Sequence, residues 1–319
     1  MRAAKFLEAE LKNFEIAFDK AVKSHIPLLD VVMHYVAQRK GKQLRPIFVL
    51  LSAKMCGQVT DQSYRAAALI ELLHTATLVH DDVVDDAETR RGFFSINALW
   101  KNKIAVLVGD YLLSKGLLLS LNNNDFAILR ILSEAVKEMS EGELLQIEKA
   151  RKLDITEEVY YNIIKAKTAS LIANACAAGA YSATQDEALS NRFKLFGEKI
   201  GYAFQIQDDL FDYGSFDVGK PTGNDIKEKK ITLPLIHTLQ KVDTTTKRKI
   251  KYIVKNKNKS NDDVQWVIQQ VIANGGIEFA QKAIDNFMQE AHDIIETLPQ
   301  GEATEVMKDL VEYISKRKK

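Results

Sequence analysis

The sequence predicts an all-α fold, and three observations support this prediction. Apolar residues recur at three- and four-residue intervals along most of the chain, as they do on the buried face of a helix. Alternating runs that would form strands are few, and only five prolines interrupt the 319 residues. Short links such as 122–125 between long periodic segments indicate one large helical bundle around a central cavity, in a single domain spanning residues 1–319.

The same periodicity defines the individual helices. We expect helices at residues 4–23, 27–39, 44–55, 63–88, 105–121, 126–149, 157–166, 168–182, 187–213 and 233–240. Further helices follow from Thr245 to the C-terminus. Two of them are separated at Asn274-Gly275-Gly276, because consecutive glycines interrupt a helix.

Composition argues against several classes of protein. The 44 basic and 43 acidic residues leave a net charge of +1, which is unlike a nucleic-acid-binding protein. Cys56 and Cys176 are far apart in the sequence, so neither a disulfide framework nor a thiolate zinc site is indicated, and a cytoplasmic location is expected. The amphipathic pattern of residues 1–21 differs from the continuous apolar core of a signal peptide.

Two segments raise the question of membrane contact. The uncharged stretch 168–185 is built mainly from small and polar residues, so we expect a tightly packed interior helix and not a membrane span. The lysine-rich run 247–259 is expected to be a solvated helix face and loop. Weak attraction of this run to anionic lipid headgroups is the alternative interpretation.

A cluster of aspartates interrupts an apolar helical segment at residues 69–92. Asp81 and Asp85 are i,i+4 neighbours on one helix face, and Asp82 lies beside them. Three carboxylates at close range repel one another unless a cation lies between them. The pattern therefore predicts a site for a divalent metal ion.

A second cluster repeats the arrangement, with Asp208 and Asp212 at i,i+4 spacing and Asp209 between them. A single acidic cluster is often a solvated helix face. Two copies, each within an apolar helical segment, favour a functional interpretation.

Basic and amide groups accompany both clusters. Lys42 and Arg45 lie at the start of a helix, where free backbone N–H groups suit a phosphate, although such a loop can also simply face solvent. Arg90 and Arg91 follow the first cluster, and pairing with Asp86 or Glu88 is the alternative to phosphate binding. The remaining candidate donors are Lys167, Thr168, Gln205, Lys220 and Lys230, of which Lys220 lies in a loop, 219–225, expected to close over a charged ligand.

These motifs, taken in order, resemble those of one enzyme family. They read GKQLRP, ELLHTATLVHDDVVD, RRG, KTASL, FQIQDDLFD and GKPTGNDIKEKKITLP, between residues 41 and 234. The set is similar to that of the trans-isoprenyl diphosphate synthases, or polyprenyl synthetases, especially the medium- and long-chain type that makes heptaprenyl or octaprenyl diphosphate. The resemblance implies the isoprenoid synthase fold, an all-helical homodimer with a deep pocket between two aspartate-rich motifs.

The resemblance also implies a reaction and a role for each motif. An allylic diphosphate such as geranyl or farnesyl diphosphate ionises, isopentenyl diphosphate condenses with the cation, and a proton is eliminated. About three Mg²⁺ ions would be held by six catalytic, metal-binding aspartates, Asp81, Asp82, Asp85, Asp208, Asp209 and Asp212. Isopentenyl diphosphate would be bound by Gly41, Lys42, Arg45, His74 and Arg91. The allylic diphosphate would be bound by Arg90, Lys167, Thr168, Gln205, Lys220 and Lys230. Without the resemblance, His74 would be interpreted as a core histidine.

In this family, the residues four and five positions before the first aspartate motif line the tunnel for the growing product. Here they are Thr77 and Ala76, whose small side chains leave the tunnel open. Candidates for the tunnel floor are Leu73, Leu113, Gly116 and Leu117. We therefore expect an all-trans heptaprenyl or octaprenyl product, a precursor of a quinone side chain, with a farnesyl- or geranylgeranyl-length product as the alternative.

Three other functions compete with this interpretation. A terpene cyclase typically has an NSE or DTE motif in place of the second aspartate motif. A ferritin-like di-iron site needs a second Glu-x-x-His beside Glu71 and His74, and none occurs. A regulatory synthase subunit has no use for six acids. The expected partners are the two diphosphates and a second copy of the chain, with weak membrane-surface contact for product release and no nucleic acid.

Overall fold

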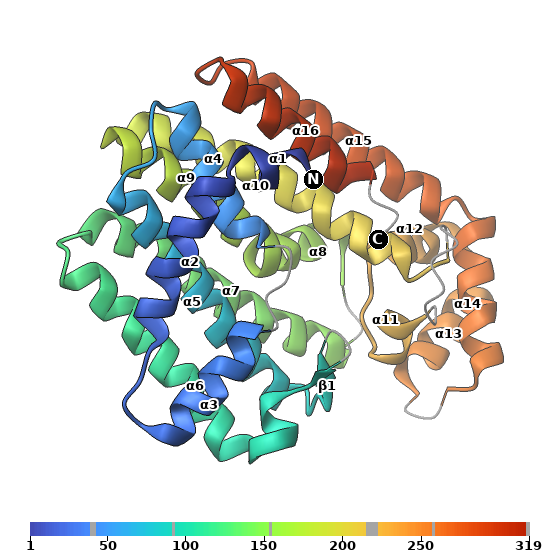
Figure 1. Cartoon of the computed structure of the whole chain (residues 1–319). Helices are drawn as coiled ribbons and strands as arrows, with labels where there is room; N and C mark the ends of the chain where they lie inside the picture. The colour runs from blue at the N-terminus through green and yellow to red at the C-terminus, as the bar shows by residue number, and fades with distance from the viewer. Residues whose placement is uncertain (39–42, 91–92, 153–154, 215–222, 257–258, 317–319) are drawn as a thin grey trace. The chain divides into compact units, whose positions relative to one another are not determined.

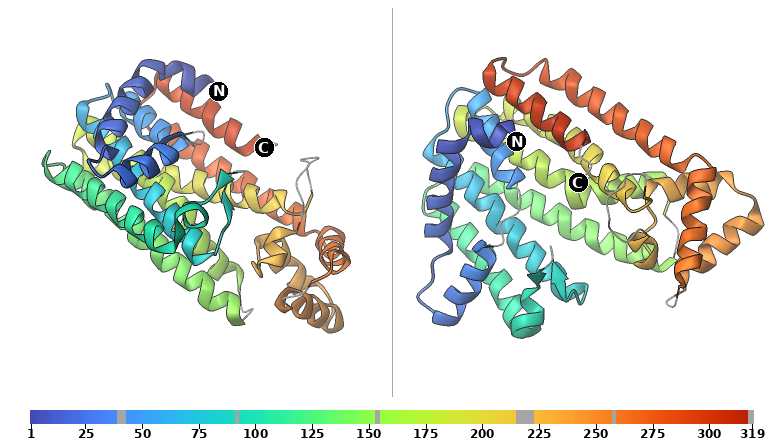
Figure 2. Two further views of the ribbon diagram at one scale, coloured as in Figure 1. Left: turned by 60° about the horizontal axis from the view of Figure 1, so that its bottom comes forward. Right: turned by 45° about the vertical axis from the view of Figure 1, so that its right-hand side comes forward.

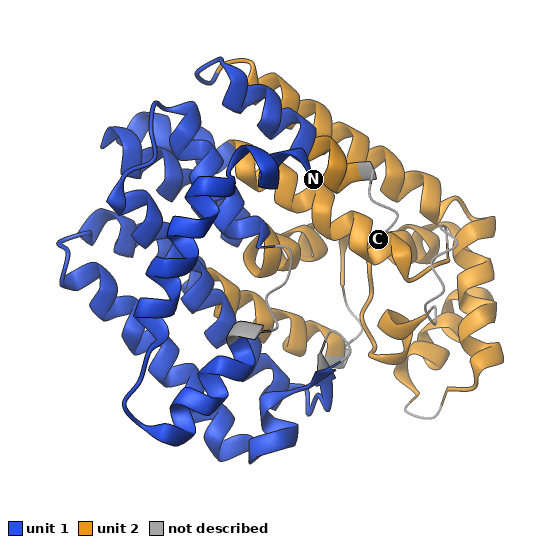
Figure 3. Ribbon diagram, viewed as in Figure 1, with its two compact units in different colours: residues 1–137, 171–195, 298–310 blue, residues 138–170, 196–297, 311–319 orange. Residues whose placement is uncertain are grey.

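The computed structural model describes residues 1–38, 43–90, 93–152, 155–214, 223–256 and 259–316, and most of these residues are helical (Figure 1). The all-α prediction is thereby confirmed. Contacts divide the chain into two compact units (Figure 3). Unit 1 comprises residues 1–137, 171–195 and 298–310, and unit 2 comprises residues 138–170, 196–297 and 311–319. The single-domain assignment stays a prediction.

Unit 1 is built around helix α5, which packs against α2, α4 and α6 (Figures 1 and 2). Its elements are α1 (Arg2–Phe6), α2 (Glu8–Val22), α3 (Pro27–Gln38), α4 (Leu44–Met55), α5 (Asp61–Val84), β1 (Thr89–Arg90), β2 (Phe93–Phe94) and α6 (Ile96–Leu121). Parts of α7 (Phe126–Lys152), α9 (Ser170–Thr184), α10 (Glu187–Phe211) and α16 (Glu302–Lys316) complete it. A capping box between Thr60 and Ser63 satisfies backbone groups at the start of α5.

The structure corrects several predicted boundaries in unit 1. The first expected helix is divided at Leu7 into α1 and α2. Helix α5 ends four residues early, because the backbone turns to a positive φ of 49° at Asp86 and then forms the short antiparallel β1–β2 ladder. Helix α6 begins at Ile96, with Ser95 as its N-cap, and is interrupted at Lys101, where φ is 72°.

Residues 171–180 in helix α9 are all buried. The interior helix expected for residues 168–182 is therefore confirmed, although the expected break before Thr168 is not. A π-helix, η1 (Lys165–Ala169), continues the chain from α8 (Glu157–Ile164) into α9. By length and composition alone, α6 is the one helix among the described residues that could cross a membrane.

Unit 2 contains α8, η1 and the remaining parts of α7, α10 and α16. Its other elements are α11 (Asn224–Lys227), α12 (Leu233–Lys241), α13 (Thr244–Lys255), α14 (Asn261–Ala273) and α15 (Gly276–Ile295). Apolar residues of these helices form one core, to which α10 contributes Ile206 and Leu210. The predicted break at residues 274–276 is confirmed between α14 and α15.

Candidate active site

Helix α10 carries the second aspartate motif at its C-terminal end. Ile206 and Leu210 are buried in the unit 2 core, which fixes the rotation of the helix about its axis. Asp208 and Asp209 lie in its last turn, and Asp212 follows the helix end at Phe211. Acids at this end oppose the helix dipole, so the motif gathers negative charge where the backbone already presents its carbonyl groups.

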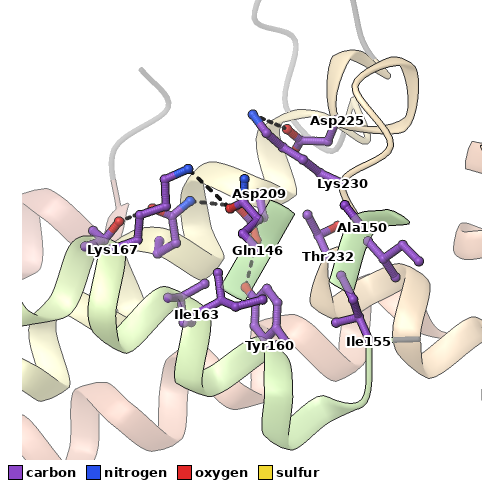
Figure 4. Close-up of a pocket in the computed structure, with 14 residues that line it drawn as sticks. Gln146, Ala150, Ile155, Tyr160, Ile163, Lys167, Asp209, Asp225, Lys230 and Thr232 are labelled. Carbon is purple, nitrogen blue, oxygen red and sulfur yellow. Dashed lines mark hydrogen bonds and ion pairs between the residues drawn. The ribbon is translucent and has the colours of Figure 1, made fainter. Parts of the chain in front are cut away.

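A chain of side-chain hydrogen bonds holds Asp209 (Figure 4). The Thr168 hydroxyl donates to Gln205 Oε1 at 2.6 Å, and Gln205 Nε2 donates to Asp209 Oδ1 at 2.8 Å. The Tyr160 hydroxyl donates to the other carboxylate oxygen, Oδ2, at 2.7 Å. Thr168, Gln205 and Asp209 were all predicted site residues, and the structure brings them together.

A close approach of η1 to α10 explains how Thr168 reaches Gln205. A Cβ atom built on Gly201 would lie 2.3 Å from Ala169 Cα, so a larger residue at position 201 would push the two segments apart. Gln205 follows Gly201 by one helical turn, and Thr168 precedes Ala169. The lack of a side chain at Gly201 therefore lets η1 approach α10 closely enough for Thr168 to donate to Gln205.

The backbone at the start of α11 binds the carboxylate of Asp212. Asn224 N–H donates to Oδ1 at 2.8 Å, and Asp225 N–H donates to Oδ2 at 2.9 Å. Gly223 N–H donates to the backbone oxygen of Asp212 at 2.8 Å. Gly223 has a φ of 81°, a conformation that favours glycine, so the sequence at this position permits the turn.

Burial raises the pKa values of three acids at this site. Desolvation, reinforced by Asp225, raises the pKa of Asp209 to about 8, although the bonds from Tyr160 and Gln205 oppose the shift. Desolvation and then Asp212 raise the pKa of Asp225 to about 6, and Lys230, 4.0 Å away, opposes this shift. Desolvation also raises the pKa of Asp212. A cation beside these carboxylates would relieve the unfavourable charge.

A cavity of about 220 Å³ in unit 2 lies beside these groups (Figure 4). Five predicted site residues line it, namely Lys167, Thr168, Gln205, Asp209 and Lys230. Lys167 forms an ion pair with Glu143 and donates to Gln146 Oε1 at 3.2 Å. Ile155, Ile163 and Ile164 supply an apolar part of the wall. The cavity therefore combines cationic donors, a carboxylate and an apolar surface.

The first aspartate motif lies at the C-terminal end of α5, in unit 1. Asp81 and Asp82 are in the last turn, and Asp85 is the exposed C-cap residue. Asp82 is only 4% exposed, and Asn97 Nδ2 donates to its backbone oxygen at 3.2 Å. Both motifs therefore share one design, in which acids gather at the negative end of a helix that has no basic residue in its last turn.

The two motifs fit a divalent metal through oxygen ligands, the donor type that Mg²⁺ prefers. Within the described ranges, no three acidic, histidine or cysteine side chains are already grouped closely enough to hold a metal ion. In unit 2, the Asp209 and Asp212 carboxylates are instead held by hydrogen-bond donors. Metal binding there would require these carboxylates to use their remaining lone pairs.

The predicted isopentenyl diphosphate site belongs to unit 1 where it is described. Arg45 is half-buried near the start of α4, and His74 is buried on α5. Arg90 lies in β1, as a predicted contact of the allylic diphosphate. Four other predicted residues, Gly41, Lys42, Arg91 and Lys220, lie outside the described residues.

The chain-length candidates lie on α5 and α6. Leu73 and Ala76 are buried, and half-buried Thr77 donates to the His74 carbonyl at 2.8 Å. Gly116 is buried beside Leu73, since a Cβ there would lie 3.6 Å from Leu73 Cδ2. The other two candidates differ in exposure, Leu113 being half-buried and Leu117 exposed. Their role as a tunnel floor stays a prediction.

Sequence reasoning missed several residues that line the cavity, among them Gln146, Tyr160 and Asp225. Gln146 contacts Lys167 from α7, and Tyr160 contacts Asp209 from α8. Asp225 lines the cavity and ends the predicted loop 219–225, but the sequence predicted no role for its side chain. A buried tyrosine in an apolar helix looks like a core residue in sequence, so only the position of the Asp209 carboxylate reveals its second function.

Comparisons with known proteins identify the family of this chain. The family model described as Polyprenyl synthetase matches residues 26–271. Over 318 residues, the chain is 34% identical to heptaprenyl diphosphate synthase component 2 of Bacillus subtilis (strain 168), covering 99% of this chain and 90% of that protein. It is 32% identical over 294 residues to octaprenyl diphosphate synthase of Escherichia coli (strain K12), covering 91% and 90% of the two chains.

A solved structure extends the likeness to three dimensions. The crystal structure of polyprenyl synthase from Caulobacter crescentus CB15, complexed with calcium and isoprenyl diphosphate, matches with a TM-score of 0.91 and 30% identity, covering 100% of this chain and 98% of that one. These matches confirm the family, the isoprenoid synthase fold and the enzyme class expected from the sequence. The chain therefore belongs to the polyprenyl synthetase family and is a trans-prenyltransferase that makes polyprenyl diphosphates.

Proposed function

We propose that this enzyme condenses isopentenyl diphosphate with geranyl or farnesyl diphosphate to give an all-trans heptaprenyl or octaprenyl diphosphate. The observation that carries this proposal is the unit 2 cavity, where four predicted diphosphate-binding residues meet Asp209 of the second aspartate motif. The names of the Bacillus subtilis and Escherichia coli relatives support the product range. Small side chains at Ala76 and Thr77 support a long product over a farnesyl- or geranylgeranyl-length one.

The cavity residues supply the chemistry that such a reaction needs. Lys167 and Lys230 would bind the diphosphate oxygens and stabilise the negative charge that develops on the leaving group. Apolar side chains such as Ile163 and Ile164 would keep water from an allylic cation. No side chain needs to act as a nucleophile, because the double bond of isopentenyl diphosphate forms the new carbon–carbon bond.

Mg²⁺ is proposed as the resident metal, with about three ions per site. The six aspartates of the two motifs would hold it, and it would neutralise diphosphate charge when bound. The calcium in the Caulobacter crescentus structure supports use of a divalent ion in the family. The raised pKa values of Asp209, Asp212 and Asp225 support a site that gains by binding a cation.

A homodimer is proposed from the exposed face of α6. Leu107 and Leu118 are three turns apart on this face and are 63% and 51% exposed. Val106, Leu117 and Leu121 are also exposed along the helix. A third of the most apolar stretch of α6 is buried within the chain, so an apolar surface is left for a second copy to cover. The name "component 2" of the Bacillus subtilis relative makes a second, different subunit the alternative.

Membrane contact during product release is proposed for the basic face of α13, defined by Arg248, Lys251, Tyr252 and Lys255. These residues follow i, i+3, i+4 and i+7 spacing, opposite the buried Ile250, and the helix contains no acid. The four side chains are exposed, and Tyr252 is 71% exposed. Basic side chains around an amphipathic tyrosine suit binding to anionic lipid headgroups. We propose that the enzyme acts in the cytoplasm, at the surface of such a membrane.

One assay tests the activity and the product length together. Purified protein is incubated with Mg²⁺, isopentenyl diphosphate and either geranyl or farnesyl diphosphate, and the dephosphorylated products are sized by mass spectrometry. A series of products ending at seven or eight isoprene units is expected from the proposed heptaprenyl or octaprenyl range. Cyclic hydrocarbons from the allylic substrate alone would indicate a cyclase, and inactivity of folded protein until a second subunit is added would indicate a heteromeric enzyme.

A further inference from the structure

We propose that Tyr160 is a positioning residue that fixes the carboxylate of Asp209 for metal binding. Tyr160 lies on α8, outside the sequence motifs, and is only 3% exposed. Its hydroxyl donates to Asp209 Oδ2 at 2.7 Å, and Asp209 is itself only 6% exposed. The proposal rests on the proposed metal-binding role of Asp209 and names a residue outside the motifs that supports it.

The two oxygens of Asp209 each receive one donor from the protein. Gln205 donates to Oδ1 from one helical turn away, and Tyr160 donates to Oδ2 from a different helix. Donors on both oxygens fix the plane of the carboxylate, whereas Gln205 alone would leave it free to rotate. A carboxylate has about four lone-pair sites, so these two bonds leave two for a cation.

The second donor has a distinct origin from the first. Gln205 is oriented by Thr168, because the Thr168 hydroxyl donates to Gln205 Oε1 and thereby directs Nε2 toward Asp209. The Tyr160 hydroxyl acts independently of that chain. Loss of either donor would be felt at Asp209, and loss of the Tyr160 hydroxyl would remove one bond without disturbing the Thr168–Gln205 pair.

The ring of Tyr160 is held by packing and not by its hydroxyl alone. It belongs to the apolar core of unit 2 and lies edge-on to Tyr161, with ring centroids 5.6 Å apart. Phenylalanine at position 160 would therefore keep the ring in place while removing the donor. This makes Tyr160→Phe a specific probe of the hydrogen bond.

The consequence concerns metal affinity more than substrate affinity. Groups that orient a metal-binding side chain typically change metal affinity by about 10- to 100-fold when removed. We expect Tyr160→Phe to weaken divalent metal binding by about 10-fold or more and to raise the Mg²⁺ concentration needed for half-maximal activity. The KM for isopentenyl diphosphate should change little, because Tyr160 is not among its predicted contacts, such as Arg45 and His74.

Tyr161→Phe is the matched control. Tyr161 is the next residue on α8, is half-buried, and packs edge-on against Tyr202 and Phe287, with ring centroids 6.0 and 5.7 Å away. It is absent from the lining of the cavity. Removing its hydroxyl should therefore leave metal binding close to that of the wild type.

The experiment measures Mn²⁺ binding to the full chain, without substrate, by electron paramagnetic resonance. A Kd raised about 10-fold in Tyr160→Phe and unchanged in Tyr161→Phe supports the proposal. Equal Mn²⁺ affinity in wild type and Tyr160→Phe overturns it, even if the melting temperature of the variant falls. Should Tyr160→Phe not fold, Tyr160→Met removes the same hydroxyl and fills the core with a flexible apolar side chain, and Mn²⁺ affinity equal to that of the wild type there overturns the proposal.

The wild type separates the failure of this inference from that of the proposed function. If the wild type elongates the substrate and binds Mn²⁺, only the comparison with Tyr160→Phe decides the role of Tyr160. If the wild type elongates the substrate without binding Mn²⁺ in this assay, the inference is overturned while the activity stands. If it does neither, the proposed function fails first.

Discussion

Gly201 on α10 lies against Ala169 in η1, so closely that a Cβ on Gly201 would be 2.6 Å from the Ala169 Cβ. The contact involves backbone as well as side-chain atoms of η1, so a methyl group cannot be accommodated by turning one flexible side chain. It also lies next to the hydrogen bond from Thr168 to Gln205. Packing and the orientation of site residues therefore depend on the same pair of residues.

Gly201→Ala should destabilise the protein by about 1–3 kcal/mol, because overpacking a close contact forces the backbone to move. The variant should also lose activity beyond the loss explained by unfolding, since Thr168 and Gln205 would move apart. Urea unfolding and an elongation assay on the folded fraction measure the two effects. Gly301→Ala is the control, because a Cβ there meets nothing within 4 Å. Equal stability of the two variants would contradict the packing argument.

Ala76→Phe should shorten the product, because Ala76 is fully buried on α5 and an aromatic ring there would fill space predicted to receive the growing chain. Ala76→Leu should shorten it less. Product mass after complete elongation is the measurement, and the melting temperature of each variant identifies any overpacked protein. An unchanged product length with retained activity would show that Ala76 does not line the tunnel.

In the absence of metal, the contribution of Asp209 to the free energy of unfolding should fall as pH rises. The folded-state pKa of Asp209 is about 8, above the usual 3.8. The folded protein therefore holds a proton that the unfolded chain releases, so this group lowers the free energy of unfolding as pH increases from about 4 to about 8. In EDTA, Asp209→Asn should gain stability relative to the wild type at the upper end of that range.

Urea unfolding near both ends of this pH range measures the difference. Asp285→Asn is the control, because Asp285 also accepts from a glutamine four residues away, Gln281, but does so at the surface. That variant should follow the wild type at both pH values. Parallel behaviour of Asp209→Asn and Asp285→Asn would mean that burial of Asp209 has no effect on stability.

Charge on the α6 face should disrupt the proposed dimer. Leu107→Glu together with Leu118→Glu places two carboxylates on the exposed apolar surface, and burying them against a second copy would be costly. Light scattering after size exclusion should change from twice the 35.9 kDa chain mass to the chain mass. Ile272→Glu, at an exposed apolar residue of α14, should leave the dimer intact. A wild-type chain that is monomeric would exclude the homodimer.

Reversing charge on the basic face of α13 should weaken binding to anionic vesicles. Lys251→Glu with Lys255→Glu should lose about 2 kcal/mol or more, since each basic residue near an anionic surface contributes about 1 kcal/mol. Cosedimentation with vesicles containing phosphatidylglycerol measures the change. Lys20→Glu with Lys23→Glu makes the same charge change at exposed positions at the end of α2. Equal losses in the two variants would point to total charge and not to α13.

Sequence patterns predicted the helices more reliably than their ends. Helix α4 has the predicted bounds, because it is buried along most of its length and its apolar residues are clear in sequence. The β1–β2 ladder was missed because two residues per strand are too few to show an alternating pattern. The start of α6 was missed because the interruption at Lys101 breaks the helical period there.

The site was predictable where chemistry is visible in the residue type. Lys167, Gln205 and Asp209 are polar residues in apolar helices, and the structure places all three at one cavity. Tyr160 and Asp225 were not predictable, because their roles depend on which atoms the fold brings near them. The Asp212 carboxylate accepts from backbone N–H groups. Every residue but proline has such a group, so the residue types in the sequence do not reveal this contact.

The π-helix at Lys165–Ala169 gives the enzyme a tolerance for a change in chain length at its centre. A π turn holds one more residue than an α turn, so it absorbs a single inserted residue without unwinding the helices on either side. Removing one residue from it would restore a regular α-helix and leave α8 and α9 in place, so the change would be confined to the side chains within the π turn. Lys167 and Thr168 lie within this turn and line the cavity, so the fold tolerates the loss of the extra residue but the site does not.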